Sequence, residues 1–393
     1  MSEPGHVVVA GAGLAGLRTI EELRSRDFAG QITLIGAEER LPYDRPPLSK
    51  KLMTGALDDT SLRPHLDDLQ VRVRLAETAT GVGDGFLATD AGQYAFDALV
   101  LATGATPVRL PGTGPQFVLR TLDDALTLRK LLTPGLRLAI IGAGWIGAEL
   151  ATAAAGRGCQ VTVLEAGPAP LASAITAEVG GCTTGWYAEA GVDLRLGQGV
   201  AEVAPGGLAL AGGGWLDADV VVTAVGVRPA VSWLAGSGIE LDNGIAVDAG
   251  LRTSLPGVFA VGDCAAFQSG RYGRRLRFEH WDVALHAPEV AAANVLGGAA
   301  EYDPVPYFWS EQFGRMVQYV GYHGHADQLL WRGDPAAGRW AAAWLAGGRL
   351  AALLTVGLPR DLQQGRRVIS SAARIDPARL ADPQIPVRDA VLA

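Results

Sequence analysis

The sequence predicts an α/β protein in which one βαβ unit occurs twice and an α+β part follows. Near residue 10 and again near residue 141, an apolar strand leads into a glycine-rich turn and then into a helical stretch. Each of these passages is followed by alternating, glycine-punctuated sequence, which predicts a short antiparallel meander, and then by a second apolar strand. From Asp303 onwards aromatic-rich strands replace this pattern, which predicts a separate C-terminal α+β domain. The tail from Asp376 is rich in proline and aspartate, so we expect it to lie along the surface.

The first unit starts with the strand Val7-Val8-Val9-Ala10. Its turn is Gly11-Ala12-Gly13-Leu14-Ala15-Gly16, after which we expect a helix to about Arg26. A second strand, Ile32 to Ile35, ends near Glu38. The closing strand of this half is Asp97-Ala98-Leu99-Val100-Leu101-Ala102-Thr103-Gly104.

The second unit repeats this design. The strand Leu138 to Ile141 leads into Gly142-Ala143-Gly144-Trp145-Ile146-Gly147. We expect a helix to about Arg157 and a strand from Val161 to Leu164 that ends at Glu165. The closing strand runs from Asp219 through Val220-Val221-Val222 to Gly226.

Composition and charge bound the function. The 393 residues are enough for two or three domains, and the net charge of −8 argues against general nucleic-acid binding. The sequence contains no uncharged apolar run of about 18 residues, and no basic stretch precedes the first strand, so we expect no membrane insertion, no signal peptide and a cytoplasmic location. The three cysteines, Cys159, Cys182 and Cys264, show no metal-like spacing, so we expect no metal site.

The two glycine-rich turns predict dinucleotide binding. In a G-x-G-x-x-G turn the first glycine allows the strand to turn into the helix, and the second lets a pyrophosphate approach the helix N-terminus. The third glycine lets helix and strand pack closely. A single such motif is weak evidence, but here strand, turn, helix and a terminal acid occur together twice.

The two terminal acids are candidates for holding a ribose diol. Glu38 follows Gly16 by 22 residues, and Glu165 follows Gly147 by 18. A carboxylate accepts hydrogen bonds from a free 2′-hydroxyl but repels a 2′-phosphate. Since no Arg or Lys follows Glu165 before Arg195, the second site is predicted to prefer NADH over NADPH.

Together with the stretch Tyr43-Asp44-Arg45-Pro46-Pro47-Leu48-Ser49-Lys50 and the pair Gly262-Asp263, these motifs give the chain its resemblance to a known family. It resembles the FAD-dependent NADH:ferredoxin reductases of oxygenase systems, in the pyridine nucleotide-disulfide oxidoreductase superfamily. Tyr307-Phe308-Trp309-Ser310-Glu311-Gln312 extends the similarity into the C-terminal part.

The resemblance implies a glutathione-reductase-like fold with two Rossmann-like domains. It places a discontinuous FAD domain at residues 1–109 and 229–304, an NAD domain at 110–228 and a C-terminal interface domain at 305–393. FAD would lie on the first glycine-rich turn and NADH on the second. The resemblance also implies that FAD contacts the following residues: Arg45, Lys50, Ala79, Ala102, Thr103, Gly104, Arg129, Asp263 and Trp281.

The mechanism that follows is hydride transfer from NADH to FAD and then single-electron steps to an iron–sulfur ferredoxin, expected to be of the two-iron type. No cysteine precedes Cys159, which disfavours disulfide, peroxide and coenzyme A disulfide reductases. Lys50 is hypothesised to pair with Glu149 and to stabilise negative charge on the ring. The alternatives are a solvated Lys50 and a surface Glu149; Trp145 can cover a ring or simply pack.

Other functions stay open at this level. The same site suits a rubredoxin reductase, a nitrite-reductase-associated NADH oxidoreductase, or an NADH-sensing flavoprotein like apoptosis-inducing factor. Four arginines, Arg271, Arg274, Arg275 and Arg277, form either a docking patch for an acidic ferredoxin or a solvated loop. The protein is expected to be a monomer or a weak dimer.

Overall fold

The computed structural model describes residues 4–62 and 66–392. The chain divides into two compact units, and each is described separately below. The first unit comprises Met1–Asp44, Thr60–Thr106 and Arg228–Pro306, and the second comprises Arg45–Asp59, Pro107–Val227 and Tyr307–Ala393. The predicted FAD domain therefore corresponds to the first unit except for Arg45–Asp59, while the predicted NAD and C-terminal domains lie in one unit. The three-domain division stays a prediction.

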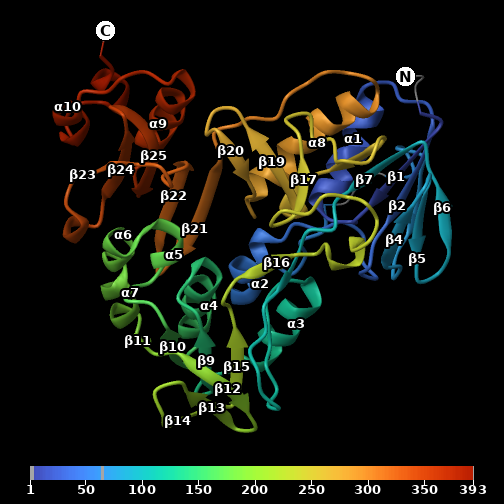
Figure 1. Ribbon diagram of the computed structural model, residues 1–393. Coiled ribbons are helices and arrows are strands. Elements are labelled where there is room, and N and C mark those ends of the chain that lie inside the picture. The colour runs from blue at the N-terminus through green and yellow to red at the C-terminus, as the bar shows by residue number, and fades with distance from the viewer. Residues whose placement is uncertain (1–3, 63–65, 393) are drawn as a thin grey trace. The chain divides into compact units, whose positions relative to one another are not determined.

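A five-stranded parallel sheet forms the centre of the first unit (Figure 1). The strands at its centre carry apolar side chains on both faces, as in a sheet that is covered on both sides, and Val7, Val8 and Val9 are fully buried. Helices α1 (Leu14–Ser25) and α8 (Trp281–Val295) pack against each other in this unit. In spatial order the strands are β18 (Val258–Ala260), β7 (Ala98–Leu101), β1 (His6–Ala10), β2 (Gln31–Ile35) and β3 (Val71–Arg74).

Two three-stranded sheets also belong to the first unit. One is the predicted meander, of strands β4 (Ala79–Gly83), β5 (Phe86–Thr89) and β6 (Gln93–Ala95). The other consists of β17 (Ile245–Val247), β19 (Ala265–Ser269) and β20 (Arg274–Leu276).

The second unit contains the repeat of the βαβ design. Four parallel strands form its first sheet, and α4 (Trp145–Gly156) follows β9 as α1 follows β1. The spatial order is β11 (Asp193–Leu196), β10 (Gln160–Glu165), β9 (Arg137–Ile141) and β15 (Val220–Thr223). The second predicted meander is also present, as β12 (Val200–Ala204), β13 (Gly207–Leu210) and β14 (Trp215–Asp217).

Helices of the second unit flank this sheet or precede it. Thr121 caps α3 (Leu122–Leu131) by accepting a hydrogen bond from the Asp124 backbone N–H. Other helices that precede the C-terminal part of this unit are η1 (Pro46–Ser49), α2 (Lys51–Thr54), α5 (Ala172–Ile175), α6 (Ala177–Gly181) and α7 (Thr184–Glu189).

The C-terminal part of the second unit is a five-stranded antiparallel sheet with α9 (Pro359–Ser371) packed against β25. In spatial order its strands are β21 (Tyr307–Gln312), β22 (Arg315–Gly321), β25 (Arg349–Val356), β24 (Trp340–Ala346) and β23 (Gln328–Arg332). The parallel sheets and this antiparallel sheet confirm the predicted fold class.

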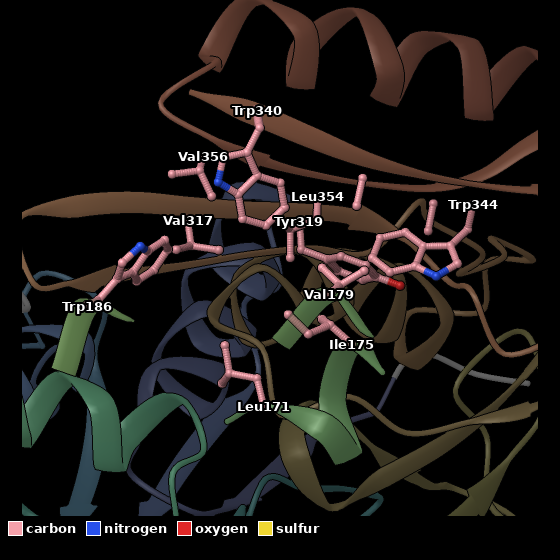
Figure 2. Close-up of a cluster of buried hydrophobic side chains, with 12 residues drawn as sticks. Leu171, Ile175, Val179, Trp186, Val317, Tyr319, Trp340, Trp344, Leu354 and Val356 are labelled. Carbon is pink, nitrogen blue, oxygen red and sulfur yellow. The ribbon is translucent and has the colours of Figure 1, made fainter. Parts of the chain in front are cut away.

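Figure 2 shows the core that joins the two parts of the second unit. Trp340, Trp344 and Tyr319 project from the antiparallel sheet. They pack with apolar side chains from the segment that follows β10, among them Ile175 and Val179. Because this core is buried and rich in aromatic side chains, it holds the C-terminal sheet and the second βαβ unit together within one compact unit.

The tail differs from the expectation. We expected residues from Asp376 onwards to lie along the surface, but Leu380, Val387 and Ala390 are fully buried. Arg332, 3 % exposed, donates to Asp361 and to the backbone carbonyls of Leu380 and Asp382. A buried cation therefore anchors the tail.

Candidate functional site

The first glycine-rich turn needs two of its glycines for its own geometry. Gly11 has φ +124°, and a Cβ there would lie 2.1 Å from the Ala102 carbonyl oxygen. A Cβ on Gly16 would lie 1.9 Å from the Gly11 carbonyl oxygen. Strand β1, helix α1 and the Ala102 carbonyl thus approach one another as the motif requires.

The middle glycines of both turns indicate a ligand. Gly13 (φ −89°) and Gly144 (φ −76°) have backbone conformations that any residue adopts, and a Cβ on either would meet nothing within 4 Å. The protein's own packing therefore does not demand glycine at these positions. Each is the N-cap of its helix, α1 or α4, without a side-chain cap hydrogen bond, so the space and the helix N-terminus together fit a pyrophosphate.

The second turn repeats this geometry. Gly142 has φ +102°, and a Cβ there would lie 2.5 Å from the Ala224 carbonyl oxygen; a Cβ on Gly147 would lie 2.0 Å from the Gly142 oxygen. Two large apolar side chains beside this turn are exposed, Ile146 at 41 % and Val225 at 40 %. Gly226, which follows, has φ +106° and open space at its Cβ position. An exposed apolar rim is what a planar ring of a bound nucleotide would cover.

The two terminal acids have defined partners. Glu38, after β2, accepts a hydrogen bond of 2.6 Å from the Tyr43 hydroxyl, a contact the sequence analysis did not predict. Glu165, at the end of β10, accepts from the backbone N–H of Ala143 at 2.8 Å and of Gly167 at 2.7 Å. Glu165 is therefore bonded to the glycine-rich turn itself, and its remaining lone pairs can accept from a ribose hydroxyl.

The other predicted FAD residues of the first unit lie partly around the same turn. The closing strand β7 is followed by Ala102, Thr103 and Gly104, and the Thr103 hydroxyl donates to the Ala230 carbonyl. A Cβ on Gly262 would lie 3.1 Å from the Ala15 side chain, so Gly262 and Asp263 begin η3 (Gly262–Cys264) beside α1.

Ala79 and Trp281 begin other elements of the first unit. Ala79 is the first residue of β4. Trp281 begins α8, and its indole N–H donates to the Asp44 carboxylate at 2.8 Å. Neither residue has a geometry that tests its predicted contact with FAD.

Arg45, Lys50 and Arg129 lie in the second unit. Arg45 donates to the Arg120 carbonyl at 2.6 Å. Arg129, on α3, forms an ion pair with Asp58 at 2.8 Å. These contacts hold the segment Arg45–Asp59 to α3, and the predicted FAD contacts of these residues stay predictions.

The hypothesised ion pair between Lys50 and Glu149 is present. Lys50 Nζ lies 2.8 Å from Glu149 Oε2, and the two side chains are 12 % and 2 % exposed. The Ser49 hydroxyl also donates to Oε2, and the Ser310 hydroxyl donates to Oε1 at 2.6 Å. Glu149 is therefore a buried carboxylate with hydrogen-bond donors on both oxygens, and the alternative of a surface residue is wrong.

Trp145 packs in the second unit against the C-terminal sheet. Its ring centroid lies 4.8 Å from that of Phe308, at an interplanar angle of 50°. The indole is only partly buried, so it combines a packing role with an exposed face.

The arginine cluster of the first unit is partly neutralised. Arg275 contacts Glu240 at 3.1 Å and Asp242 at 3.2 Å, and Arg277 pairs with Glu279 at 2.8 Å. Two of the four cations proposed for docking are thus paired within the unit, which weakens the docking interpretation.

The residues around the start of α8 include a neutral histidine. Burial lowers the pKa of His280 to about 4, although the Asp263 carboxylate opposes this shift. Its ring stacks on Phe278, with centroids 5.2 Å apart. His280 is consequently uncharged at neutral pH.

The cysteines give no sign of a redox pair. All three are free, and Cys264, which follows Asp263, is fully buried. Burial raises the pKa of the Cys264 thiol, which keeps it protonated. Within residues 4–62 and 66–392, no three metal-ligand side chains cluster, and no helix is long and apolar enough to cross a membrane.

Comparison with known families places two matches along the chain. Residues 5–287 match the pyridine nucleotide-disulphide oxidoreductase family, and residues 307–391 match the reductase C-terminal family. The boundary between the matches falls where the aromatic-rich strands begin.

Individual relatives match along nearly their whole length. The ferredoxin–NAD(+) reductase component of the anthranilate 1,2-dioxygenase system of Burkholderia cepacia is 37 % identical, over 96 % of this chain and 97 % of the relative. The crystal structure of Fdr9 is 49 % identical with TM-score 0.94, covering 98 % of this chain and 99 % of that one. The covalent complex of putidaredoxin reductase with putidaredoxin is 30 % identical with TM-score 0.94, covering 98 % and 97 %.

Proposed function

The chain belongs to the pyridine nucleotide-disulphide oxidoreductase family, and on this premise we propose that it transfers electrons from NADH, through FAD, to an iron–sulfur ferredoxin. The family binds FAD and NAD(P)H, and the chain is an oxidoreductase. One observation carries the assignment of two nucleotides: each glycine-rich turn has a middle glycine that faces open space at a helix N-terminus. Bound FAD would accept a hydride, which carries two electrons, from NADH. It would then release the proton and pass the two electrons on one at a time, as a ferredoxin requires.

We assign FAD to the first unit. Gly11, Gly13, Leu14, Ala15 and Gly16 would cradle its pyrophosphate, and Glu38 would accept from a ribose hydroxyl. Asp263, in η3 beside α1, would accept from a further hydroxyl of the same cofactor.

We assign NADH to the second glycine-rich turn. Gly142, Gly144 and Gly147 would hold its pyrophosphate, and Ile146 would cover a ring. Glu165 supports NADH rather than NADPH, because its carboxylate, fixed by two backbone N–H groups, would repel a 2′-phosphate.

We place Lys50 and Glu149 at the reacting rings. Lys50 would stabilise negative charge that develops on the acceptor ring, and Glu149 keeps the ammonium group in place and can accept from the nicotinamide amide. The 158 residues before Cys159 contain no cysteine, so no protein thiol is needed to carry the electrons onward.

The acceptor we propose is a two-iron ferredoxin that serves an oxygenase, either a cytochrome P450 or a Rieske dioxygenase. The names of the relatives support it, since one is a component of a dioxygenase system and another forms a complex with putidaredoxin. The match spans at least 97 % of those proteins, so the comparison concerns whole enzymes and not one shared domain.

The test is steady-state reduction of cytochrome c by the FAD-loaded protein and NADH, with and without an added two-iron ferredoxin. We expect rapid reduction only when ferredoxin is present, and a slower reaction with NADPH. A slow reaction that ferredoxin does not accelerate, with a long-lived complex of NAD and reduced flavin, would instead support an NADH-sensing flavoprotein.

A further inference from the structure

We propose that Ser310 is a positioning residue for the NADH reaction, because its hydroxyl fixes the Glu149 carboxylate in the orientation that pairs with Lys50. The inference rests on the proposed function and adds to it a residue from the C-terminal sheet. Ser310 lies 161 residues after Glu149 in the sequence.

The alternation of strand β21 explains how Ser310 reaches this position. In the antiparallel register Phe308 pairs with Tyr319 and Ser310 pairs with Val317, and both partners belong to the buried core shown in Figure 2. Side chains alternate between the faces of a sheet, so Phe308, Ser310 and Gln312 share the face that carries this core. Strand β21 packs against α4, the helix of Glu149.

The donors around Glu149 come from two sides. Lys50 and Ser49, both in the segment Arg45–Asp59, donate to Oε2. Ser310 is the donor to Oε1 among the described residues. The terminal torsion of a glutamate is soft, so a carboxylate held at one oxygen can still rotate. A donor on the second oxygen removes this freedom. Because the carboxylate is then fixed, the position of the Lys50 ammonium group that pairs with it is fixed as well.

Gln312 directs the Ser310 hydroxyl toward the carboxylate. Its side-chain N–H donates to Ser310 Oγ at 3.0 Å, and the Ser310 O–H is then left to donate to Glu149. Ser310 and Gln312 are both fully buried, so water does not compete for these groups. The side-chain carbonyl oxygen of Gln312 has no hydrogen-bond partner among the described residues.

A second contact fixes the distance between strand and helix. The Phe313 backbone N–H donates to the Thr152 hydroxyl at 2.9 Å, and Thr152 lies three residues after Glu149 on α4. The Phe313 ring also packs on Tyr187, with centroids 4.6 Å apart. The backbone three residues after Ser310 is therefore anchored to the face of α4 that carries Glu149.

The experiment compares FAD-loaded variants by stopped-flow reduction with NADH. We expect Ser310→Ala to slow flavin reduction at saturating NADH by about tenfold, with little change in the NADH dissociation constant. Ser310→Thr should restore most of the rate because it keeps the hydroxyl. The control is Thr183→Val, which removes another buried hydroxyl of the same unit, one that donates to the Gly180 carbonyl; it should leave the rate unchanged.

A double-mutant cycle separates positioning from general damage. If Ser310 acts through Glu149, then Ser310→Ala combined with Glu149→Gln will be no slower than Glu149→Gln alone. Crystal structures of the wild type and Ser310→Ala should show the carboxylate rotated only in the variant. Additive losses, or a carboxylate that keeps its orientation in Ser310→Ala, would overturn the inference.

The outcome also distinguishes this inference from the proposed function. If the wild type is not reduced by NADH, the proposed function fails, and the crystal structures still decide whether Ser310 orients Glu149. If the wild type is reduced but Ser310→Ala reacts equally fast, only the positioning role is wrong.

Discussion

Lys50 Nζ and Glu149 Oε2 lie 2.8 Å apart, although the two residues are separated by 99 positions in the sequence. Lys50 lies between η1 and α2, and Glu149 lies on α4 behind the second glycine-rich turn. Removing one partner of a buried ion pair leaves the other charge buried without compensation. Each partner therefore offsets the free-energy cost of burying the other. This buried ion pair is the feature to which we assign a role at the reacting rings.

Replacing Lys50 should slow flavin reduction much more than replacing its neighbour Lys51. We expect Lys50→Met to slow flavin reduction by NADH by about 100-fold, because the positive charge near the acceptor ring is lost. The control is Lys51→Met, since Lys51 is exposed on α2 and should be replaceable without effect. Stopped-flow absorbance measures both, and an unchanged rate in Lys50→Met would remove Lys50 from the mechanism.

The glycines of the first turn should separate folding from cofactor binding. Gly13→Ala should leave the thermal midpoint of the flavin-free protein near that of the wild type, because a methyl group meets open space there. The same variant should retain much less FAD. Gly11→Ala should instead destabilise the fold by more than about 1 kcal/mol, since φ is +124° and a Cβ would approach the Ala102 carbonyl. Flavin absorbance and thermal unfolding check both, and full FAD retention in Gly13→Ala would contradict the ligand interpretation.

Glu165 should control the choice between NADH and NADPH. We expect Glu165→Gln to lower the ratio of kcat/KM for NADH to that for NADPH by about tenfold. The change should come mainly from a lower KM for NADPH, because the repulsion of the 2′-phosphate is relieved. Glu202→Gln is the matched control, as Glu202 is an exposed acid on β12 of the same unit. Equal ratios in all three proteins would show that Glu165 does not face the ribose.

The pH dependence of stability should carry a contribution from His280. The unfolded state binds a proton on this residue below about pH 6.5, whereas the folded state does so only below its pKa of about 4. The unfolded state therefore binds more protons between these values, and the free energy of unfolding falls as the pH drops through this window. Thermal unfolding of the wild type and His280→Gln from pH 7.5 to 4.5 tests this, with the exposed His286→Gln as control. The His280 variant should lose less stability than the other two, and parallel curves would be inconsistent with a buried neutral histidine.

The glycine-rich turns and the strands around them could be predicted from sequence because their signals are local. Gly11 and Gly142 adopt positive φ within a few residues of the strands that define them. The acids Glu38 and Glu165 end the next strands at a nearly fixed spacing. Backbone geometry of this kind is encoded within about 30 residues.

The contacts of Glu149 beyond Lys50 could not be predicted, since they depend on tertiary packing. Ser310 reaches the carboxylate only because β21 pairs with β22 in one register; a shift of one residue would turn it to the other face. The same holds for Arg275, whose acidic partners Glu240 and Asp242 lie more than 30 residues earlier in the sequence. A charge cluster in a sequence does not reveal which of its members are already paired.

The burial of the tail could not be predicted from the sequence for a related reason. Its proline and aspartate residues are typical of a surface segment, but Leu380 and Val387 are both fully buried. Asp376 caps α10 (Pro377–Ala381), and Asp382 accepts a hydrogen bond from the Gln384 backbone N–H. The composition of the tail therefore indicates its exposed polar residues, but it does not indicate that Leu380 and Val387 are buried.

A single anaerobic experiment tests the central claim most directly. The FAD-loaded protein is mixed with one equivalent of NADH and then with an excess of oxidised two-iron ferredoxin, while flavin and iron–sulfur absorbance are followed. We predict that NADH bleaches the flavin and that the ferredoxin then restores it, with two ferredoxins reduced for each NADH. A flavin that NADH reduces but that ferredoxin leaves bleached would contradict the account.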